Sequence, residues 1–256
     1  MIKKVLIFTD SRGEHKLTFK NKKIFTEKIT EYLQQKDIEV DLMLCPFCWT
    51  STIDFIQLFE EKIVNEKDYD LIILYTGVVE YSPRPLTNYY TALNGNNLNE
   101  EITFDKLIKG KKKIYNNKLD FMKKIISNEL LNDKIYDIEY MGEKTKSLVS
   151  LEMNEKIITP YLKTLGNKLI FINSNKCVKG WEGNYILKNK NGRPSNINII
   201  EEYSKQTIGK FENYIDLLKW DDNDIKKYTV DNMHLTFEGS EYIYNKLIDI
   251  LNKLII

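Results

Sequence analysis

Two short segments at opposite ends of the chain carry the residue types needed for attack on an acyl carbon. Ser11 follows an apolar run, Lys4–Phe8, on a polar turn that also contains Gly13. His234, one of only two histidines, stands three residues after Asp231. A serine hydroxyl needs an adjacent base to become a nucleophile, and the imidazole needs a carboxylate to fix its tautomer. Each segment alone is more typical of a turn or a helix cap, so the prediction depends on their coming together.

The two segments together resemble the first and last motifs of the SGNH (GDSL-like) hydrolase family. The matching residues are Asp10-Ser11 after the first predicted strand and the stretch Asp231–Gly239, which begins Asp-x-x-His-Leu-Thr and ends on Gly. The resemblance spans nearly the whole chain and implies a three-layer α/β/α fold. It also implies Ser11 as nucleophile, His234 as general base and Asp231 as the carboxylate that orients the imidazole.

The sequence departs from the family pattern around the expected oxyanion site. Thr9 replaces the glycine that opens the first motif, and Trp49 stands at about the place of a glycine whose N–H faces the oxyanion. The third motif, usually Gly-x-Asn-Asp, reads Gly-Val-Val-Glu over Gly77–Glu80, so the Asn donor is absent. Losing one such donor typically lowers the rate about 10²–10³-fold. Backbone N–H groups of Ser11 and near Trp49 or Gly77 remain as candidate donors.

Arg84 is a candidate replacement for the absent Asn donor. It is equally a candidate to bind an acidic substrate group or to pair with Glu80, and the sequence leaves these alternatives open. The third motif and the Ser-Pro-Arg that follows it resemble a variant SGNH subgroup associated with bacterial polysaccharide gene clusters. Trp181, in another stretch with the same likeness, can stack on a sugar or fill the core. Arg12 and His15, close to the nucleophile in the sequence, are further candidates for the rim of the cleft.

Alternating strand and helix patterns predict the fold that would bring these segments together. Continuous apolar runs, typical of parallel strands covered on both faces, predict strands over Lys4–Phe8, Glu39–Leu44, Asp70–Tyr75 and Lys168–Asn173. Such alternation predicts a three-layer α/β/α domain of flavodoxin-like type over residues 1–256, with a central, mostly parallel sheet. Binding sites in such sheets gather at the carboxyl ends of the strands, which is where Ser11, Trp49 and Gly77 fall.

The remaining segments have less regular patterns of apolar residues. Helical spacing predicts helices over Phe211–Leu218 and Phe237–Leu254, and Tyr228–Val230 is a candidate last strand. Residues 86–165 hold helix patterns without a clear strand, which predicts a helical insertion.

Composition excludes several classes of protein. The net charge is +1, from 38 basic and 37 acidic side chains, so no field of one sign exists to attract nucleic acid. No apolar run approaches the roughly 20 residues of a membrane span, and the first apolar run is too short for a signal peptide. Three cysteines, an odd number, fit a reducing compartment, and we expect a cytoplasmic protein. No metal or cofactor is expected, and nothing indicates the oligomeric state.

The predicted function is an esterase that removes, or transfers, an O-acyl group on a carbohydrate, most naturally an O-acetyl group. Two alternatives stay open. The loss of the oxyanion residues favours a non-catalytic module that binds a glycan. The spacing of Cys45 and Cys48, after a strand and before a helix, is typical of a thiol redox site.

Overall fold

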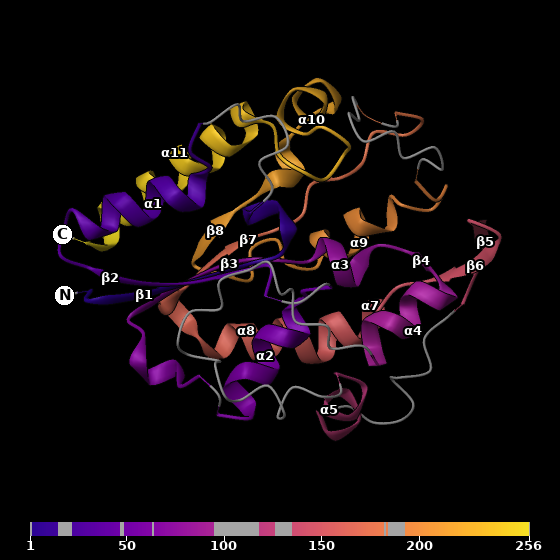
Figure 1. The fold of residues 1–256 in the computed structure, drawn as a ribbon, viewed down its shortest axis with the longest axis horizontal. Helices are drawn as coiled ribbons and strands as arrows, with labels where there is room; N and C mark the ends of the chain where they lie inside the picture. Colours follow the sequence, from indigo (N-terminus) through magenta and orange to yellow (C-terminus); the bar gives the residue numbers. More distant parts are fainter. Residues whose placement is uncertain are drawn as a thin grey trace.

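A central parallel sheet lies between layers of helices (Figure 1), and its inner strands are buried apolar runs of the sequence. The computed structural model describes residues 2–14, 22–46, 49–62, 64–94, 118–125, 135–181, 183 and 193–255. The five strands of the sheet are β1 Lys4–Thr9, β2 Glu39–Leu44, β3 Leu71–Tyr75, β7 Leu169–Ile172 and β8 Asn213–Ile215. They are parallel and lie in the order β2-β1-β3-β7-β8. The order in which successive strands join the sheet reverses between β1 and β3: β2 lies on one side of β1, and β3 lies on the other. In α/β proteins with this strand order, ligands bind at that point.

Helices cover both faces of this sheet. Alternate residues of each strand point to opposite faces, so Val5 and Ile7 pack in one core while Leu6 and Phe8 pack in the other. The first core is closed by α1 Phe25–Gln34, α10 Asp222–Tyr228 and α11 Phe237–Leu254. The second is closed by helices that include α2 Thr52–Glu60, α8 Thr159–Thr164 and α9 Ile199–Lys205. The predicted α/β/α fold is therefore confirmed.

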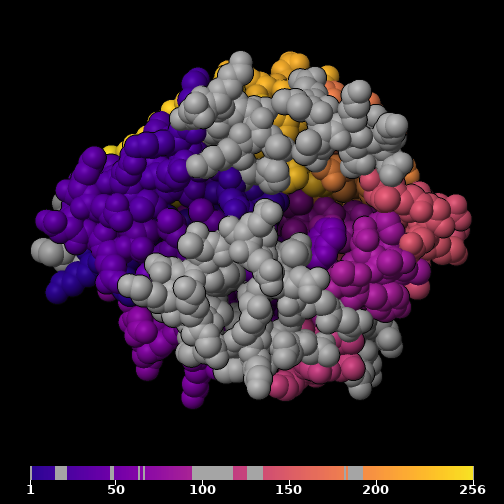
Figure 2. Space-filling view, viewed as in Figure 1, coloured from indigo at the N-terminus to yellow at the C-terminus, as the bar shows by residue number. Residues whose placement is uncertain are grey.

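The N-terminal and C-terminal parts of the chain lie side by side, which the sequence alone could only suggest. Helices α1 and α11 pack against each other over the same face of the sheet (Figure 1). Indigo and yellow atoms therefore adjoin on the surface shown in Figure 2. This contact brings the segment before α11 to the end of β1.

The segment predicted as a helical insertion also contains strands, so its description as helical was wrong. Its helices are α4 Leu86–Asn94, α5 Lys118–Ile125, α7 Leu151–Met153 and α8, and a π-helical turn, Asn154–Ile158, joins α7 to α8. Strands β5 Tyr136–Tyr140 and β6 Glu143–Lys146 form a hairpin, and β4 Arg84–Pro85 pairs with β6. The hairpin turns at Met141-Gly142, both with positive φ, as a two-residue type I′ turn requires. Its strands are polar and only partly buried, so they lack the apolar signal that marks the central sheet.

Two further predictions near the C-terminus were wrong. Residues 211–218 form β8 and a 3-10 turn, Leu217–Lys219, rather than a helix, because pairing with β7 outweighs an apolar spacing that also fits a helix. Tyr228–Val230 is not a strand of the sheet, since Thr229 makes only an isolated bridge with Leu235. This bridge instead closes the loop that carries Asp231 and His234.

Candidate active site

The turn after β1 presents Ser11 at the carboxyl edge of the sheet. Ser11–Gly13 form a 3-10 turn, and the Asp10 carboxylate caps it by accepting a hydrogen bond from the Arg12 N–H at 3.0 Å. A Cβ on Gly13 would lie 2.1 Å from the Thr9 hydroxyl oxygen, so only glycine fits there. The turn is therefore fixed by its own sequence.

Arg12 lies beneath this turn and not at the rim of the cleft, where we had expected it. Its guanidinium is fully buried and forms an ion pair with Asp10, in which Nη2 lies 2.8 Å from Oδ2. It also stacks 3.9 Å from the centre of the Tyr75 ring and donates to the Ser174 hydroxyl at 3.1 Å. Burial would lower the pKa of Arg12, but the charge and hydrogen bonds of Asp10, together with Tyr75 and Glu80, outweigh it and raise the pKa above its ordinary value. The second expected rim residue, His15, lies outside the described residues.

The loop between α10 and α11 holds Asp231 and His234 in a fixed relation. The Val230 N–H donates to the His234 carbonyl at 2.8 Å, which closes the loop. Oδ1 of Asp231 accepts backbone hydrogen bonds from Met233 at 3.1 Å and His234 at 2.7 Å. These bonds leave Oδ2 to the imidazole.

The structure brings Ser11, His234 and Asp231 into one hydrogen-bonded chain. Ser11 Oγ lies 3.2 Å from His234 Nε2, and His234 Nδ1 lies 2.8 Å from Asp231 Oδ2. Asp231 is buried, whereas His234 and Ser11 are partly exposed. This is the geometry in which an imidazole accepts a serine proton while a carboxylate holds its tautomer.

Arg193 is a fourth member of this chain that sequence reasoning did not assign. Its Nη2 donates to Asp231 Oδ2 at 2.7 Å. Burial alone would raise the pKa of Asp231, but the hydrogen bond and charge of His234, together with the charge of Arg193, hold the pKa well below its ordinary value. Asp231 therefore stays ionised at any pH at which the protein works.

Asn232 holds the same loop against the segment that follows β7. It adopts a positive φ of 70°, which Asn tolerates better than most residues. Its side chain accepts from the Val178 N–H at 2.6 Å and donates to the Trp181 carbonyl at 2.6 Å. The Asn175 side chain donates to the Asn232 carbonyl at 2.8 Å. The sequence signal for this role is weak, because Asn is common in loops.

The residues expected around the oxyanion gather at the ends of β2 and β3. Gly77 has a φ of 122° and precedes the short helix α3 Val78–Tyr81; a Cβ there would lie 2.8 Å from the Ser174 hydroxyl. The Trp49 ring packs against the Arg84 guanidinium, whose carbon lies 4.2 Å from the ring centre. Nε of Arg84 donates to the Val79 carbonyl at 3.1 Å, at the position where the family has its Asn.

Glu80 does not pair with Arg84, so one of the three alternatives for Arg84 is wrong. Glu80 is fully buried and accepts hydrogen bonds from the Thr52 N–H, at 2.9 Å, and from the Thr52 hydroxyl. Burial raises the pKa of Glu80, and the Thr52 hydrogen bonds only partly oppose it. Glu80 thus ties the N-terminus of α2 to α3.

A buried ion pair from the inserted segment supports the loop that carries Trp49. Lys118 Nζ lies 2.8 Å from Asp54 Oδ2, and both side chains are 2% exposed. The same ammonium donates to the Trp49 carbonyl at 3.0 Å and to the Ser51 hydroxyl at 3.3 Å. No signal in the sequence marks Lys118 among the many lysines around it.

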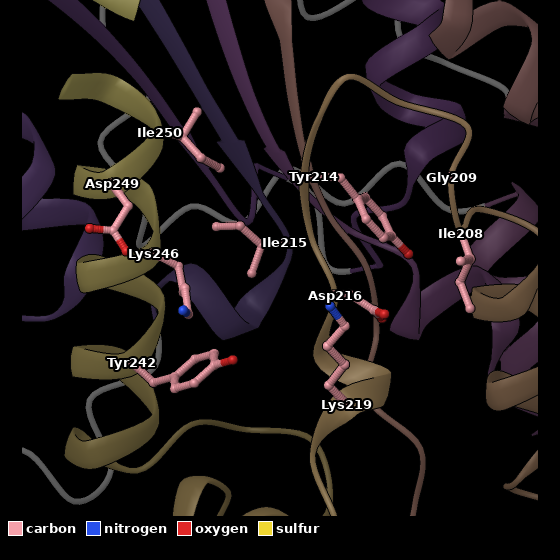
Figure 3. A pocket seen from close by; sticks show the side chains of 10 residues that line it. All are labelled: Ile208, Gly209, Tyr214, Ile215, Asp216, Lys219, Tyr242, Lys246, Asp249 and Ile250. Carbon is pink, nitrogen blue, oxygen red and sulfur yellow. The ribbon is translucent and has the colours of Figure 1, made fainter. Parts of the chain in front are cut away.

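The cysteine alternative gains little from this geometry. Cys45 is buried directly after β2, and Cys48 lies outside the described residues. The largest cavity that we describe, about 530 Å³, lies beside the edge strand β8 and α11, between side chains such as Tyr214, Lys219 and Lys246 (Figure 3). It shares no lining residue with the Ser11 chain of hydrogen bonds, and we assign it no part in the chemistry.

Comparisons with known proteins bear on the fold. No family model matches the chain, and no curated protein sequence matches it. Among solved structures, a lipase/acylhydrolase from Enterococcus faecalis aligns with 96% of this chain and 94% of its own, at 11% identity and a TM-score of 0.50. An acetyl xylan esterase aligns with 96% of this chain and 98% of its own, at 14% identity and a TM-score of 0.49.

The alignment with the lipase/acylhydrolase covers nearly all of both chains. The chain therefore has the fold of the SGNH/GDSL hydrolases, as the resemblance of its motifs predicted. In the part of the chain that the structure describes, no helix is both long and apolar enough to cross a bilayer.

Proposed function

We propose that the protein is a serine esterase of SGNH type that removes an O-acyl group, with O-acetyl esters of carbohydrates as its substrates. The observation that carries the proposal is the continuous path of hydrogen bonds from Ser11 through His234 to Asp231. It lies at the carboxyl edge of a parallel sheet, in the fold of a lipase/acylhydrolase. The acetyl xylan esterase among the similar structures agrees with a carbohydrate ester without establishing one for this chain.

The reaction follows from the positions of these atoms. Nε2 of His234 takes the Ser11 proton as Oγ attacks the acyl carbon, and Asp231 stabilises the imidazolium that forms. The N–H groups of Ser11 and of Gly77 are the candidate donors to the oxyanion. The imidazolium then protonates the departing sugar oxygen, which leaves an acyl-Ser11. Water, activated by the same imidazole, releases the acid; a sugar hydroxyl in its place would make the protein a transferase.

A non-catalytic glycan-binding module is the second candidate. Its support is that Val79 stands where the family has its Asn, so a donor normally used in catalysis is missing. The hydrogen-bonded Ser11 and His234 weigh against it, because a binding module has no need of a base next to a serine.

Hydrolysis of p-nitrophenyl acetate separates these functions. We expect wild type to release p-nitrophenol, and Ser11→Ala and His234→Ala each to lose roughly 10³-fold or more in kcat. The rate should not respond to a thiol reductant, and Cys48→Ser, the control for a thiol mechanism, should match wild type. Equal background rates in all four proteins would reject the esterase and favour the binding module. Loss in Cys48→Ser alone would favour thiol chemistry.

A further inference from the structure

Arginine is rare in this chain, and its three copies gather at one place. Of the 38 basic side chains, only Arg12, Arg84 and Arg193 are arginines. Arg12 lies under the Ser11 turn, and Arg193 donates to Asp231. A guanidinium is a rigid fork that binds carboxylates through two parallel hydrogen bonds, which an ammonium does not do. The three guanidinium groups of this lysine-rich protein thus lie around the Ser11 site, with Arg12 buried beneath its turn.

Arg84 spans the end of β1, where Ser11 begins. Its guanidinium stacks on Trp49, which follows β2, and donates to Val79, which follows β3. Strands β2 and β3 are the two neighbours of β1 in the sheet. The Trp49–Arg84 pair therefore lies across the strand that carries the nucleophile.

Arg84 differs from the other two arginines in having no counter-charge. Arg12 pairs with Asp10, and Arg193 pairs with Asp231. Within the described part of the chain, no carboxylate lies at ion-pair distance from Arg84. Burial lowers the pKa of Arg84 to about 10, and repulsion from the charge of Arg193 acts in the same direction, whereas the charges of Glu80 and Asp10, beyond ion-pair distance, oppose the shift only in part. Arg84 is still a cation at neutral pH, and a partly buried cation without a partner is costly until a ligand supplies one.

A cavity beside the loop that carries Asp231 has room for a sugar ring. It has a volume of about 290 Å³ and is lined by Trp181, Arg193 and Asn232 among other residues. Its described lining contains Lys179 and Arg193 but no acidic side chain. An aromatic face beside polar groups suits a sugar, and the positive lining favours a negative one.

We propose that Arg84 binds a carboxylate of the substrate, so that the ester hydrolysed is an O-acyl group on an acidic sugar. The inference rests on the proposed esterase function and names its substrate class. One uncompensated guanidinium matches a group with a single negative charge, which favours a carboxylate over a doubly charged phosphate. Because Arg84 is not a member of the hydrogen-bonded chain of Ser11, His234 and Asp231, we expect it to act mainly on substrate binding.

A matched pair of esters tests this assignment. The kcat/KM of an O-acetylated methyl glucuronide is compared with that of the O-acetylated methyl glucoside, for wild type and for Arg84→Met, Arg84→Lys and Lys210→Met. We expect wild type to prefer the acidic ester roughly 10- to 100-fold, the size of a hydrogen bond between charged groups. The preference should vanish in Arg84→Met through KM, and survive in part in Arg84→Lys. Lys210 is exposed and precedes β8 at the opposite edge of the sheet, so Lys210→Met should keep the full preference.

The outcomes separate the substrate class from the function. Ser11-dependent hydrolysis of both esters at equal kcat/KM would overturn the carboxylate subsite and leave the esterase intact. A fall on both esters by the same factor in Arg84→Met would also overturn it, because Arg84 would then serve the oxyanion or the fold. If neither ester is hydrolysed, the esterase fails, and the subsite is judged by calorimetric binding of methyl glucuronide. Equal binding by wild type and by Arg84→Met, the variant that removes the cation, would then overturn it too.

Discussion

The two sides of Ser11 are held in place by different parts of the chain. On the side of the nucleophile, the buried Asp10–Arg12 pair joins residues two apart in the sequence and fixes the turn from below. On the side of Trp49 and Gly77, the buried Asp54–Lys118 pair joins α2 to a helix of the inserted segment. The first side keeps the Ser, Asp and His of the SGNH pattern, although Thr9 replaces its opening glycine, whereas the second has lost its glycine and its Asn.

This difference separates what the fold requires from what a particular substrate requires. A serine, its base and the carboxylate serve any acyl substrate, and none of the three belongs to the insertion. We expect the opposite side to contact the part of the substrate that varies. The residues on the side of Trp49 and Gly77, which the insertion supports, can therefore differ between proteins while those on the Ser11 side stay the same.

Among substitutions on the nucleophile side, Asp231→Asn has the largest expected effect on catalysis. The amide has almost the same shape, but it can donate to Nδ1 of His234 and so fix the wrong tautomer, and Arg193 loses its carboxylate. We expect kcat for p-nitrophenyl acetate to fall roughly 10³–10⁴-fold, with the fold retained by circular dichroism. Asp137→Asn, in an exposed pair with Lys144, is the matched control and should be silent. Retention of kcat within tenfold in Asp231→Asn would remove Asp231 from the mechanism.

Lys118→Met tests whether the opposite side depends on the insertion. The change leaves the Asp54 carboxylate buried without its cation and frees the Trp49 carbonyl, so the free energy of unfolding should drop about 3–5 kcal/mol. Lys144→Met breaks an exposed ion pair in the same segment and should cost less than about 1 kcal/mol. Urea unfolding of both variants measures the difference. Equal, small losses would mean that the insertion does not support this side.

Glu80→Gln gives the smallest expected effect and depends on pH. Burial raises the pKa of Glu80 above its ordinary 4.5, so the native state keeps this proton at a pH where the unfolded chain has lost it. The contribution of Glu80 to stability therefore falls as the pH rises from 4.5 towards its native pKa, by at most about 1.4 kcal/mol per pH unit. Relative to Glu80→Gln, wild type should lose stability over that range in urea unfolding from pH 4 to pH 8. A constant or growing advantage of wild type would contradict the raised pKa.

Elements and motifs marked by a local pattern could be predicted from the sequence, whereas those without such a pattern could not. Strands β1, β3 and β7 could be predicted because a strand buried on both faces leaves a continuous apolar run. The edge strand β2, which is only partly buried, and the helix α1, from its helical spacing, were predicted as well. Ser11, Asp231 and His234 could be named because their motifs are short. Strand β8 was missed because three residues carry too little pattern, and β5 and β6 because they are polar.

The partners of the site were harder to predict for a physical reason. Arg193 meets Asp231 across 38 residues, and Lys118 meets Trp49 across 69. Such contacts depend on how elements pack, which no local spacing encodes. The rarity of arginine was the one signal in the sequence that could have singled out Arg193.

Labelling with a fluorophosphonate tests, without any choice of substrate, the proposal that Ser11 is a nucleophile activated by His234. The serine oxygen displaces fluoride from phosphorus, and mass spectrometry of the intact protein and its peptides locates the adduct. We expect a single adduct on Ser11 in wild type, none in Ser11→Ala, and labelling at least about 100-fold slower in His234→Ala. An unlabelled Ser11 in the folded wild type, or an equal rate in His234→Ala, would contradict the claim.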